Sequence, residues 1–190
     1  GENPSRLNAN KGVITAAKNQ NYLQRERIPM PIKVGDRLPD TKFRVMTTEG
    51  PVWKTTDEVF KGRKVALFAV PGAFTPTCNN LHIPSFLNNA AAIKAKGVHT
   101  IAVTGVNDVF VMEAWKKSTG AEGKIDFLAD GNGDFAKAID MAFDGSGNGL
   151  GTRSKRYSML VDDGVVKKLN IEDAPGKCDI SGGQTLLGQL

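Results

Sequence analysis

Thiols are scarce in this sequence, which has cysteine at only two of its 190 positions, Cys78 and Cys178. Two cysteines so far apart cannot form the disulfide framework of a small secreted domain, so the chain is expected to work in a reducing compartment. They also do not form a Cys-x-x-Cys pair, and this argues against a thiol-disulfide oxidoreductase. Because cysteine is so rare here, a redox-active thiol is the natural hypothesis.

Aromatic residues and clustered basic charge are also in short supply. The chain has two Trp and two Tyr, and its net charge is +5. Residues 1–29 hold five basic and two acidic side chains, and therefore three of the five net charges, so the remaining body is nearly balanced. Nucleic-acid binding needs a concentrated basic surface and usually aromatic platforms for the bases. The composition therefore argues against a nucleic-acid partner.

Long hydrophobic runs are missing as well. No apolar run is long enough to span a bilayer, and the N-terminus lacks the apolar core of a secretory signal, so we expect a soluble, cytoplasmic protein without a membrane partner. Residues 1–29 are rich in Asn, Gln and small residues. We interpret them as a flexible arm or an expression-derived leader; a targeting remnant, and with it an organellar location, stays open. Residues 30–190 are expected to form one domain.

The pattern along this domain alternates between short apolar runs, typical of buried strands, and segments with helical spacing. The expected strands cover residues 64–70, 98–103 and 125–128, followed by a hairpin over 157–171. The expected helices open at Thr55 or Thr56, at Cys78, at Asn107 or Asp108, at Asp134 and, with a serine cap, at Ser181. This order predicts an α/β, thioredoxin-like fold with a mixed central sheet and helices on both faces.

One segment places a thiol at the start of a helix. Cys78 follows the buried run 64–70 and falls in the first turn of the helical pattern that ends near Lys96 and Gly97. Free backbone N–H groups and the positive end of the helix dipole favour the thiolate at such a position, and the thiolate is the nucleophilic form of cysteine. Position alone leaves a second interpretation open, because a lone cysteine near a buried strand is commonly a small core residue.

The order of residues around Cys78 favours the nucleophile. Residues 71–78 read Pro-Gly-Ala-Phe-Thr-Pro-Thr-Cys and resemble the active-site segment of peroxiredoxins of the type-five (type II) subfamily. His82 and Pro84 follow at the family's spacing, and two more blocks, 106–111 and 156–159, resemble the family's second block and its arginine strand. The resemblance runs from about Ile32 to Leu190. It departs from the usual pattern at Ser85 and at the pair 104–105, where Thr and Gly stand in place of a Leu or Val and a Ser.

The resemblance implies a thiol peroxidase with a thioredoxin-like fold and no cofactor or metal. The Cys78 thiolate would attack hydrogen peroxide or an alkyl hydroperoxide and become a sulfenic acid. Arg156 would hold the thiolate and the peroxide oxygens, Thr75 would hydrogen-bond to both, and Pro71 would shield the sulfur from water. The backbone amides of Thr77 and Cys78 would point at the oxygen under attack.

The resemblance also implies partners. Glutathione with glutaredoxin, or thioredoxin, would return the oxidised enzyme to its reduced form in antioxidant defence, and the protein would form a homodimer, for which apolar residues near Phe110 are the expected seat. Cys178 lies in the loop before the last helix, where some members carry a resolving cysteine. It stands two places earlier than expected, in a slot where one-cysteine relatives carry phenylalanine, so both resolution and packing stay open.

The sequence also permits other interpretations. A binding or holdase module with an incidental cysteine is the alternative function, and Cys78, His82, His99 and Cys178 could in principle ligate zinc, although their spacing resembles no zinc unit. We expect Arg153 and Lys155 to form a solvated basic edge, and the glycine-rich stretch 145–151 a mobile surface loop. In the helix after Asp108, a stripe that includes Phe110 and Trp115 is expected to face the core.

Overall fold

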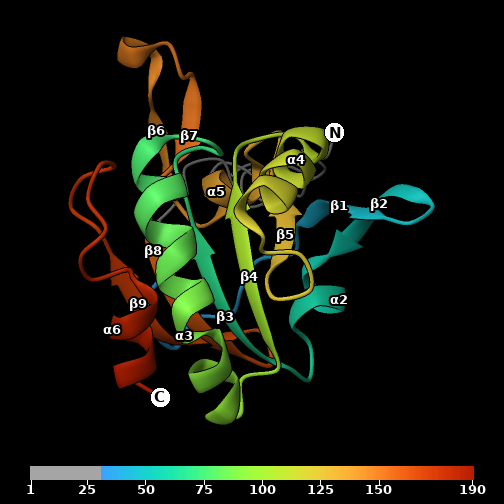
Figure 1. Ribbon diagram of the computed structural model, residues 1–190, viewed down its shortest axis with the longest axis vertical. Helices are drawn as coiled ribbons and strands as arrows, with labels where there is room; N and C mark the ends of the chain where they lie inside the picture. Colours follow the sequence, from blue (N-terminus) through green and yellow to red (C-terminus); the bar gives the residue numbers. More distant parts are fainter. Residues whose placement is uncertain (1–30) are drawn as a thin grey trace, which may run out of the picture.

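A computed structural model describes residues 31–190, so the interpretation of residues 1–29 lies outside the described part of the chain. The body is built on one mixed sheet of seven strands in the order β2-β1-β5-β4-β3-β8-β9 (Figure 1). The strands are β1 Lys42–Thr47, β2 Gly50–Thr55, β3 Lys64–Ala69, β4 Thr100–Gly105, β5 Asp126–Ala129, β8 Tyr157–Asp162 and β9 Val165–Ile171. The central pairs β3·β4 and β4·β5 are parallel, and the outer pairs are antiparallel. The expected mixed sheet is confirmed.

Helices cover both faces of this sheet, as the strand and helix order predicts. The helices are α2 Thr56–Phe60, a π-helical turn η1 Cys78–His82, α3 Ile83–Ala95, α4 Val109–Thr119, α5 Asp134–Ala138 and α6 Gly183–Gly188. Side chains of α3, α4 and α6 belong to one core cluster, and those of α2 and α5 belong to the other. Among residues 31–190 no helix has the length and apolar character that crossing a membrane requires.

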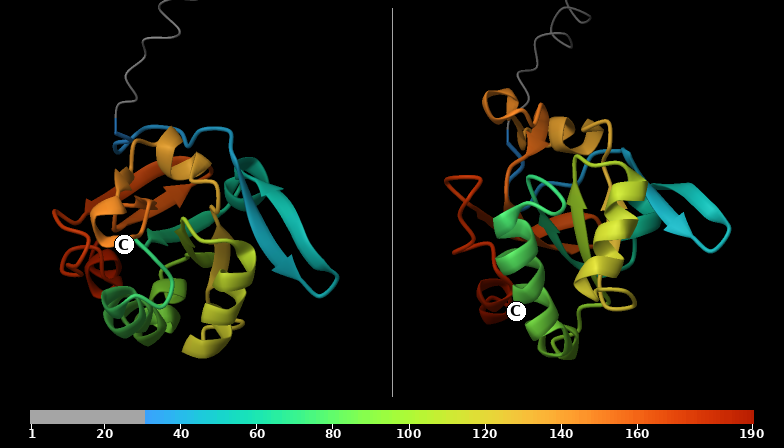
Figure 2. Two further views of the ribbon diagram at one scale, coloured as in Figure 1. Left: turned by 90° about the horizontal axis from the view of Figure 1, so that it is seen from above. Right: turned by 45° about the horizontal axis from the view of Figure 1, so that its top comes forward.

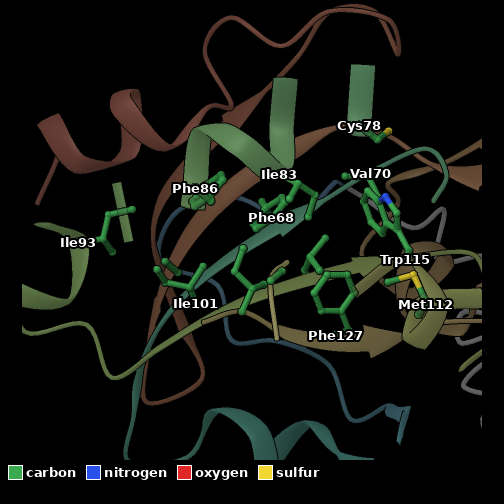
Figure 3. Packing of buried hydrophobic residues seen from close by; sticks show 14 of the residues in the cluster. Phe68, Val70, Cys78, Ile83, Phe86, Ile93, Ile101, Met112, Trp115 and Phe127 are labelled. Atoms are coloured by element: carbon green, nitrogen blue, oxygen red, sulfur yellow. The ribbon is translucent and has the colours of Figure 1, made fainter. Parts of the chain in front are cut away.

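The central strand β3 explains why one apolar run organises the fold. Its residues from Val65 to Ala69 are completely buried and point alternately into the two clusters, because successive side chains of a strand face opposite sides. Phe68 stacks on Phe86 of α3 with ring centroids 4.0 Å apart. Figure 3 shows Cys78 at one end of this cluster, close to Val70 and Trp115. The end of β3 therefore lies in the same buried cluster as the thiol of Cys78.

The helices α2 and α4 begin where the sequence predicts, and the side chains that cap them explain why. The Thr55 hydroxyl accepts a hydrogen bond from Glu58 N and completes a capping box at α2. The Asp108 carboxylate accepts from Phe110 N and Val111 N and starts α4, so Asp108, not Asn107, is the cap.

Two expectations about helix faces and caps are wrong. The buried face of α4 carries Val109, Met112 and Trp115, so Trp115 faces the core as expected. Phe110 is 65% exposed instead, because it lies off the face that these three residues, spaced three apart, share. Ser181 does not cap the last helix. Its hydroxyl donates to Glu172, and Gly182 takes the cap position without a side-chain hydrogen bond.

The sequence pattern missed a small hairpin, which runs from β6 Ala142–Asp144 to β7 Thr152–Ser154 and carries the glycine-rich stretch at its tip (Figure 2). Gly145 N donates to Gly151 O, and a single 3-10 turn, Ser146–Asn148, lies between them. A Cβ on Gly145 would come within 2.9 Å of Gly151 O, so this close approach requires glycine. The stretch lies at the surface as expected, and it forms the tip of a hairpin with its own backbone hydrogen bonds.

Candidate active site

The segment after β3 brings the thiol to a helix start. The chain leaves the sheet through residues 71–77, here called the active-site loop, and becomes helical at Pro76, so Thr77 and Cys78 lie in the first turn as predicted. Proline suits this position because its missing N–H would have no acceptor within the helix. The N–H groups of the first turn have no intrahelical acceptor either. Cys78 lies in this turn and is completely buried.

The first turn of this helix is widened. Ile83 N donates to Cys78 O across five residues, which makes residues Cys78–His82 a π turn. Pro84 gives the physical reason: it has no N–H for the carbonyl four residues earlier, and its ring would clash with that carbonyl in a regular helix. Such π turns are frequent at functional sites. A proline six positions after Cys78 was the sequence signal that could have found this turn.

Arg156 comes from the opposite side of the site, immediately before β8. Its Nη2 lies 2.9 Å from Cys78 Sγ, and the whole side chain is 2% exposed. No carboxylate among residues 31–190 lies within ion-pair distance of Arg156. A buried guanidinium stays charged and is costly without polar or anionic partners, and Cys78 Sγ is one of the groups that lie within hydrogen-bond distance of it.

His82 holds the guanidinium in place. Its Nε2 lies 2.9 Å from Ser181 O, and its Nδ1 lies 3.0 Å from Arg156 Nη1. A carbonyl can only accept and a guanidinium can only donate, so Nε2 carries the proton and Nδ1 accepts from Arg156. Burial, and secondly the charge of Arg156, lowers the pKa of His82 to about 3. The ring is therefore neutral at physiological pH.

Thr75 and Pro71 lie in the active-site loop. The Thr75 hydroxyl donates to Gly72 O over 2.7 Å, and Pro71 is buried. A hydroxyl has one hydrogen, so Thr75 offers its oxygen lone pairs to any further partner in this arrangement. The expected donation from Thr75 would require its hydrogen bond to Gly72 to be exchanged.

A loop at residues 173–180, which we call the Cys178 loop, closes the site from the C-terminal side. Glu172 accepts hydrogen bonds from Asp179 N, Ser181 N and Ser181 Oγ, which ties the two ends of the loop together. Pro175 O accepts from both Nε and Nη2 of Arg156, at 3.1 and 3.0 Å. The Thr77 hydroxyl donates to Gly176 O. The loop is therefore held at its two ends by Glu172 and in its middle by the carbonyls of Pro175 and Gly176.

Cys178 is half-buried in this loop, and both cysteines are free thiols. Burial raises the pKa of the Cys178 thiol, and the charge of Arg156 opposes this shift. The thiol form of Cys178 therefore dominates at neutral pH, and this form is a weak nucleophile.

Sequence reasoning missed two residues that contact the active-site loop. Arg153 was expected on a solvated edge, but it is half-buried, and its Nη1 donates to Pro71 O at 3.2 Å; Lys155 is exposed as expected. The sequence gives Asn107 a place in the block 106–111 and a possible role as a cap, but no contact with this loop, yet its Oδ1 accepts from Ala73 N at 2.9 Å. Alternating spacing assigns a charged strand residue to solvent unless a partner distant in sequence is known, and no such partner is visible in the local pattern.

The zinc alternative is not supported by the placement of its ligands. His99 is exposed at the start of β4, and its Nδ1 accepts from Lys64 N. Within residues 31–190 no three His, Cys, Asp or Glu side chains are arranged to hold a metal ion.

Comparisons with known proteins agree with this geometry. The Redoxin family model matches residues 33–187. Peroxiredoxin-2C of Oryza sativa is 45% identical over 161 residues, which cover 84% of this chain and 99% of that protein. Chloroplastic Peroxiredoxin-2E of Arabidopsis thaliana is 45% identical over 146 residues, 75% of this chain and 62% of that protein. The crystal structure of reduced Prx3 from Vibrio vulnificus in complex with H2O2 superposes with a TM-score of 0.80 at 46% identity, covering 83% of this chain and 98% of that chain.

A buried cysteine at a helix start, paired with an arginine from a neighbouring strand of a thioredoxin-like sheet, defines a thiol-dependent redox enzyme, and the chain belongs to the redoxin family. Within that family it is a peroxiredoxin of the type-five (type II) group. Its activity is that of an antioxidant thiol peroxidase.

Proposed function

We propose that Cys78 is the peroxide-reacting thiol and that Arg156 is the residue that activates it. The observation that carries this assignment is the 2.9 Å contact between Arg156 Nη2 and Cys78 Sγ in a buried setting. Charge-assisted hydrogen bonds of this kind are stronger than neutral ones, and they gain further in a site that excludes water. Pro71 shields the sulfur, and the amides of Thr77 and Cys78 favour an anionic oxygen beside it.

The reaction transfers one oxygen atom. An electron pair of the Cys78 thiolate attacks the terminal peroxide oxygen, an S–O bond forms, and the O–O bond breaks. The leaving oxygen departs as hydroxide or alkoxide and takes up a proton to become water or an alcohol, while Cys78 becomes a sulfenic acid. Arg156 and the first-turn amides stabilise the charge on the leaving oxygen, and Thr75 orients the peroxide through its oxygen lone pairs. Hydrogen peroxide and alkyl hydroperoxides are the proposed substrates, and the H2O2 bound in the Vibrio vulnificus relative supports this choice.

We propose an external thiol as the reductant, either glutathione with glutaredoxin or thioredoxin. The external thiolate attacks the sulfur of the sulfenic acid, an S–S bond forms, the S–O bond breaks, and the leaving hydroxide takes up a proton to become water. A second thiolate then attacks the mixed disulfide at the external sulfur and releases Cys78 as a thiolate. Resolution by Cys178 is the alternative. It is disfavoured because burial raises the pKa of Cys178 and because the contacts of Pro175 and Gly176 must break before the loop can move.

Mass spectrometry after one equivalent of H2O2 tests these roles. We expect a gain of one oxygen on Cys78 and, when glutathione is present, a glutathione adduct on Cys78, with turnover retained in Cys178→Ser. A disulfide between Cys78 and Cys178, formed faster than the adduct, would contradict the external route. Oxygen found only on Cys178 would contradict the assignment of Cys78 itself.

We also propose a homodimer and a cytoplasmic location, with an organellar one as the alternative. Apolar side chains stand exposed near the site at Phe74 and Phe110, which lie at the same end of the molecule because Asn107 bonds to Ala73. Exposed aromatic residues at a functional edge support a subunit contact there. The name of the chloroplastic Arabidopsis relative is the support for the organellar alternative.

A further inference from the structure

Arg153 makes contacts that the reaction scheme does not use. It lies in β7 of the small hairpin, far in sequence from the active-site loop, and its side chain crosses to that loop. Its Nε donates to Leu150 O at 2.9 Å, and its Nη1 donates to Pro71 O at 3.2 Å. A Cβ on Gly72 would lie 2.7 Å from Arg153 Nη1, so the guanidinium packs directly against the Gly72 backbone. Arginine suits this task because its planar fork can serve two carbonyls at once.

The loop that Arg153 contacts holds a strained residue. Phe74 has a φ of +63°, in the left-handed region that a bulky side chain rarely adopts, and it is half exposed. Such a conformation persists only when the surrounding structure holds it. Contacts to this loop come from Arg153 at Pro71, from Asn107 at Ala73 and, within the loop, from the Thr75 hydroxyl at Gly72.

We propose that Arg153 is a positioning residue for peroxide reduction: by holding the carbonyl of Pro71 it fixes the N-terminal end of the active-site loop and thereby the place of Thr75. Arg153 does not touch Cys78; its guanidinium is bonded to Pro71 O and Leu150 O, and Arg156 holds the sulfur. Removing Arg153 therefore leaves the pair of Cys78 and Arg156 intact and loosens the part of the site that orients the peroxide. The inference rests on the proposed role of Cys78 and of the active-site loop.

The test compares two reactions of the same thiol in Arg153→Gln. The second-order rate with H2O2 should fall about tenfold or more, since displacement of a positioning group by about 1 Å can cost up to a hundredfold. Alkylation of Cys78 by iodoacetamide, which needs the thiolate and no peroxide orientation, should change less than about twofold. Lys155→Gln is the matched control, because it removes the same charge two residues away from an exposed side chain, and it should leave both rates as in the wild type.

Loss of peroxide rate with retained alkylation supports the positioning role. Equal losses of both rates would overturn it, because they would show damage to the thiolate or to the fold, and so would an unchanged peroxide rate. Should Arg153→Gln fail to fold, Arg153→Lys takes its place, because lysine keeps the charge but has a single ammonium group instead of the planar guanidinium. The same two rates, with H2O2 and with iodoacetamide, are then compared in Arg153→Lys. Cys78→Ser separates the two levels: if it still consumes peroxide rapidly, the proposed function fails, whereas an inert Cys78→Ser beside a fully active Arg153→Gln refutes only the present inference.

Discussion

At the scale of single residues, the account depends on one guanidinium that serves three partners. Arg156 donates to Cys78 Sγ, to His82 Nδ1 and twice to Pro175 O. The thiol, the neutral ring and the Cys178 loop are therefore coupled through a single side chain. A change at any of these partners is expected to reach the sulfur through Arg156.

Replacement of Arg156 tests this directly. In Arg156→Ala the thiolate loses its counter-ion and the leaving oxygen loses a donor, so the second-order rate with H2O2 should fall by about a hundredfold or more. Arg156→Lys should recover little, because a point charge cannot reproduce the planar fork. Stopped-flow measurement at fixed pH gives the rates, and Lys155→Ala serves as the control. A rate within twofold of the wild type in Arg156→Ala would remove this residue from the mechanism.

The lowered pKa of His82 predicts how the free energy of unfolding depends on pH. Its pKa is about 3 in the folded protein, below the ordinary value of 6.5, so between these values the unfolded chain binds more protons and stability rises with pH. Acidification from pH 6.5 should therefore cost roughly 1.5 kcal/mol by pH 5 and on the order of 4 kcal/mol by pH 3. Denaturant titrations at several pH values measure this slope.

The His82→Gln variant should show a clearly shallower dependence on pH in the same titrations, because glutamine cannot take up a proton. His99→Gln, which removes the other histidine of the chain at an exposed position, is the matched control. Equal slopes in His82→Gln and the wild type would show that His82 is not the group that titrates.

Sequence reasoning was most successful for Cys78 and least for its charged neighbours. The helix-start position of Cys78 follows from the apolar run before it and the helical spacing after it. Arg153 and Arg156 look alike in the local pattern, and only the resemblance to peroxiredoxins distinguished Arg156. Both are buried or half-buried because β8 and the β6–β7 hairpin bring them to partners far away in sequence, and such contacts have no local signature.

At the scale of elements, the sequence pattern found the buried strands because short apolar runs bounded by turn residues are typical of buried strands. It could not find the π turn at Cys78–His82 without asking what Pro84 does to the preceding carbonyl. It also gave Ser181 the role of a cap, because a serine before a helix usually has it. The competing acceptor is the buried carboxylate of Glu172, which captures the hydroxyl and two backbone amides instead.

The hydrogen bonds by which Glu172 ties together the two ends of the Cys178 loop give a prediction at the scale of elements. In Glu172→Ala three hydrogen bonds from Asp179 and Ser181 lose their acceptor, and each unsatisfied buried donor costs about 1–3 kcal/mol. The loop should open more often, so trypsin should cut after Lys177, which lies inside it, several times faster than in the wild type. Cleavage after Lys61, at the end of α2, provides the internal control. An unchanged rate at Lys177 would show that Glu172 does not hold the loop.

At the scale of the whole molecule, the seven-stranded sheet places the site at one end of its parallel centre and the β1–β2 hairpin at an outer edge (Figure 1). The fold class could be predicted because strand and helix signals alternate along the chain. The order of strands could not, since β1 joins the sheet beside β5 through a single residue pair that local patterns do not encode.

Assembly is the prediction that belongs to this scale. If Phe74 and Phe110 form part of a subunit contact, Phe110→Glu should shift the protein from dimer toward monomer, because burying a carboxylate in an apolar interface is costly. Val34→Glu, at an exposed apolar residue near the N-terminal end of the described chain, should leave the dimer intact. Light scattering at micromolar concentration measures both, and a monomeric wild type would contradict the proposal.

The central claim is that Cys78 performs the reaction with peroxide. The most direct test mixes reduced protein in excess with H2O2, without any added reductant, and follows the remaining peroxide over time. The account predicts that the wild type and Cys178→Ser rapidly consume all of the H2O2, because reduced Cys78 is in excess, and that Cys78→Ser consumes none on the same timescale. Consumption by Cys78→Ser at the wild-type rate would contradict the account.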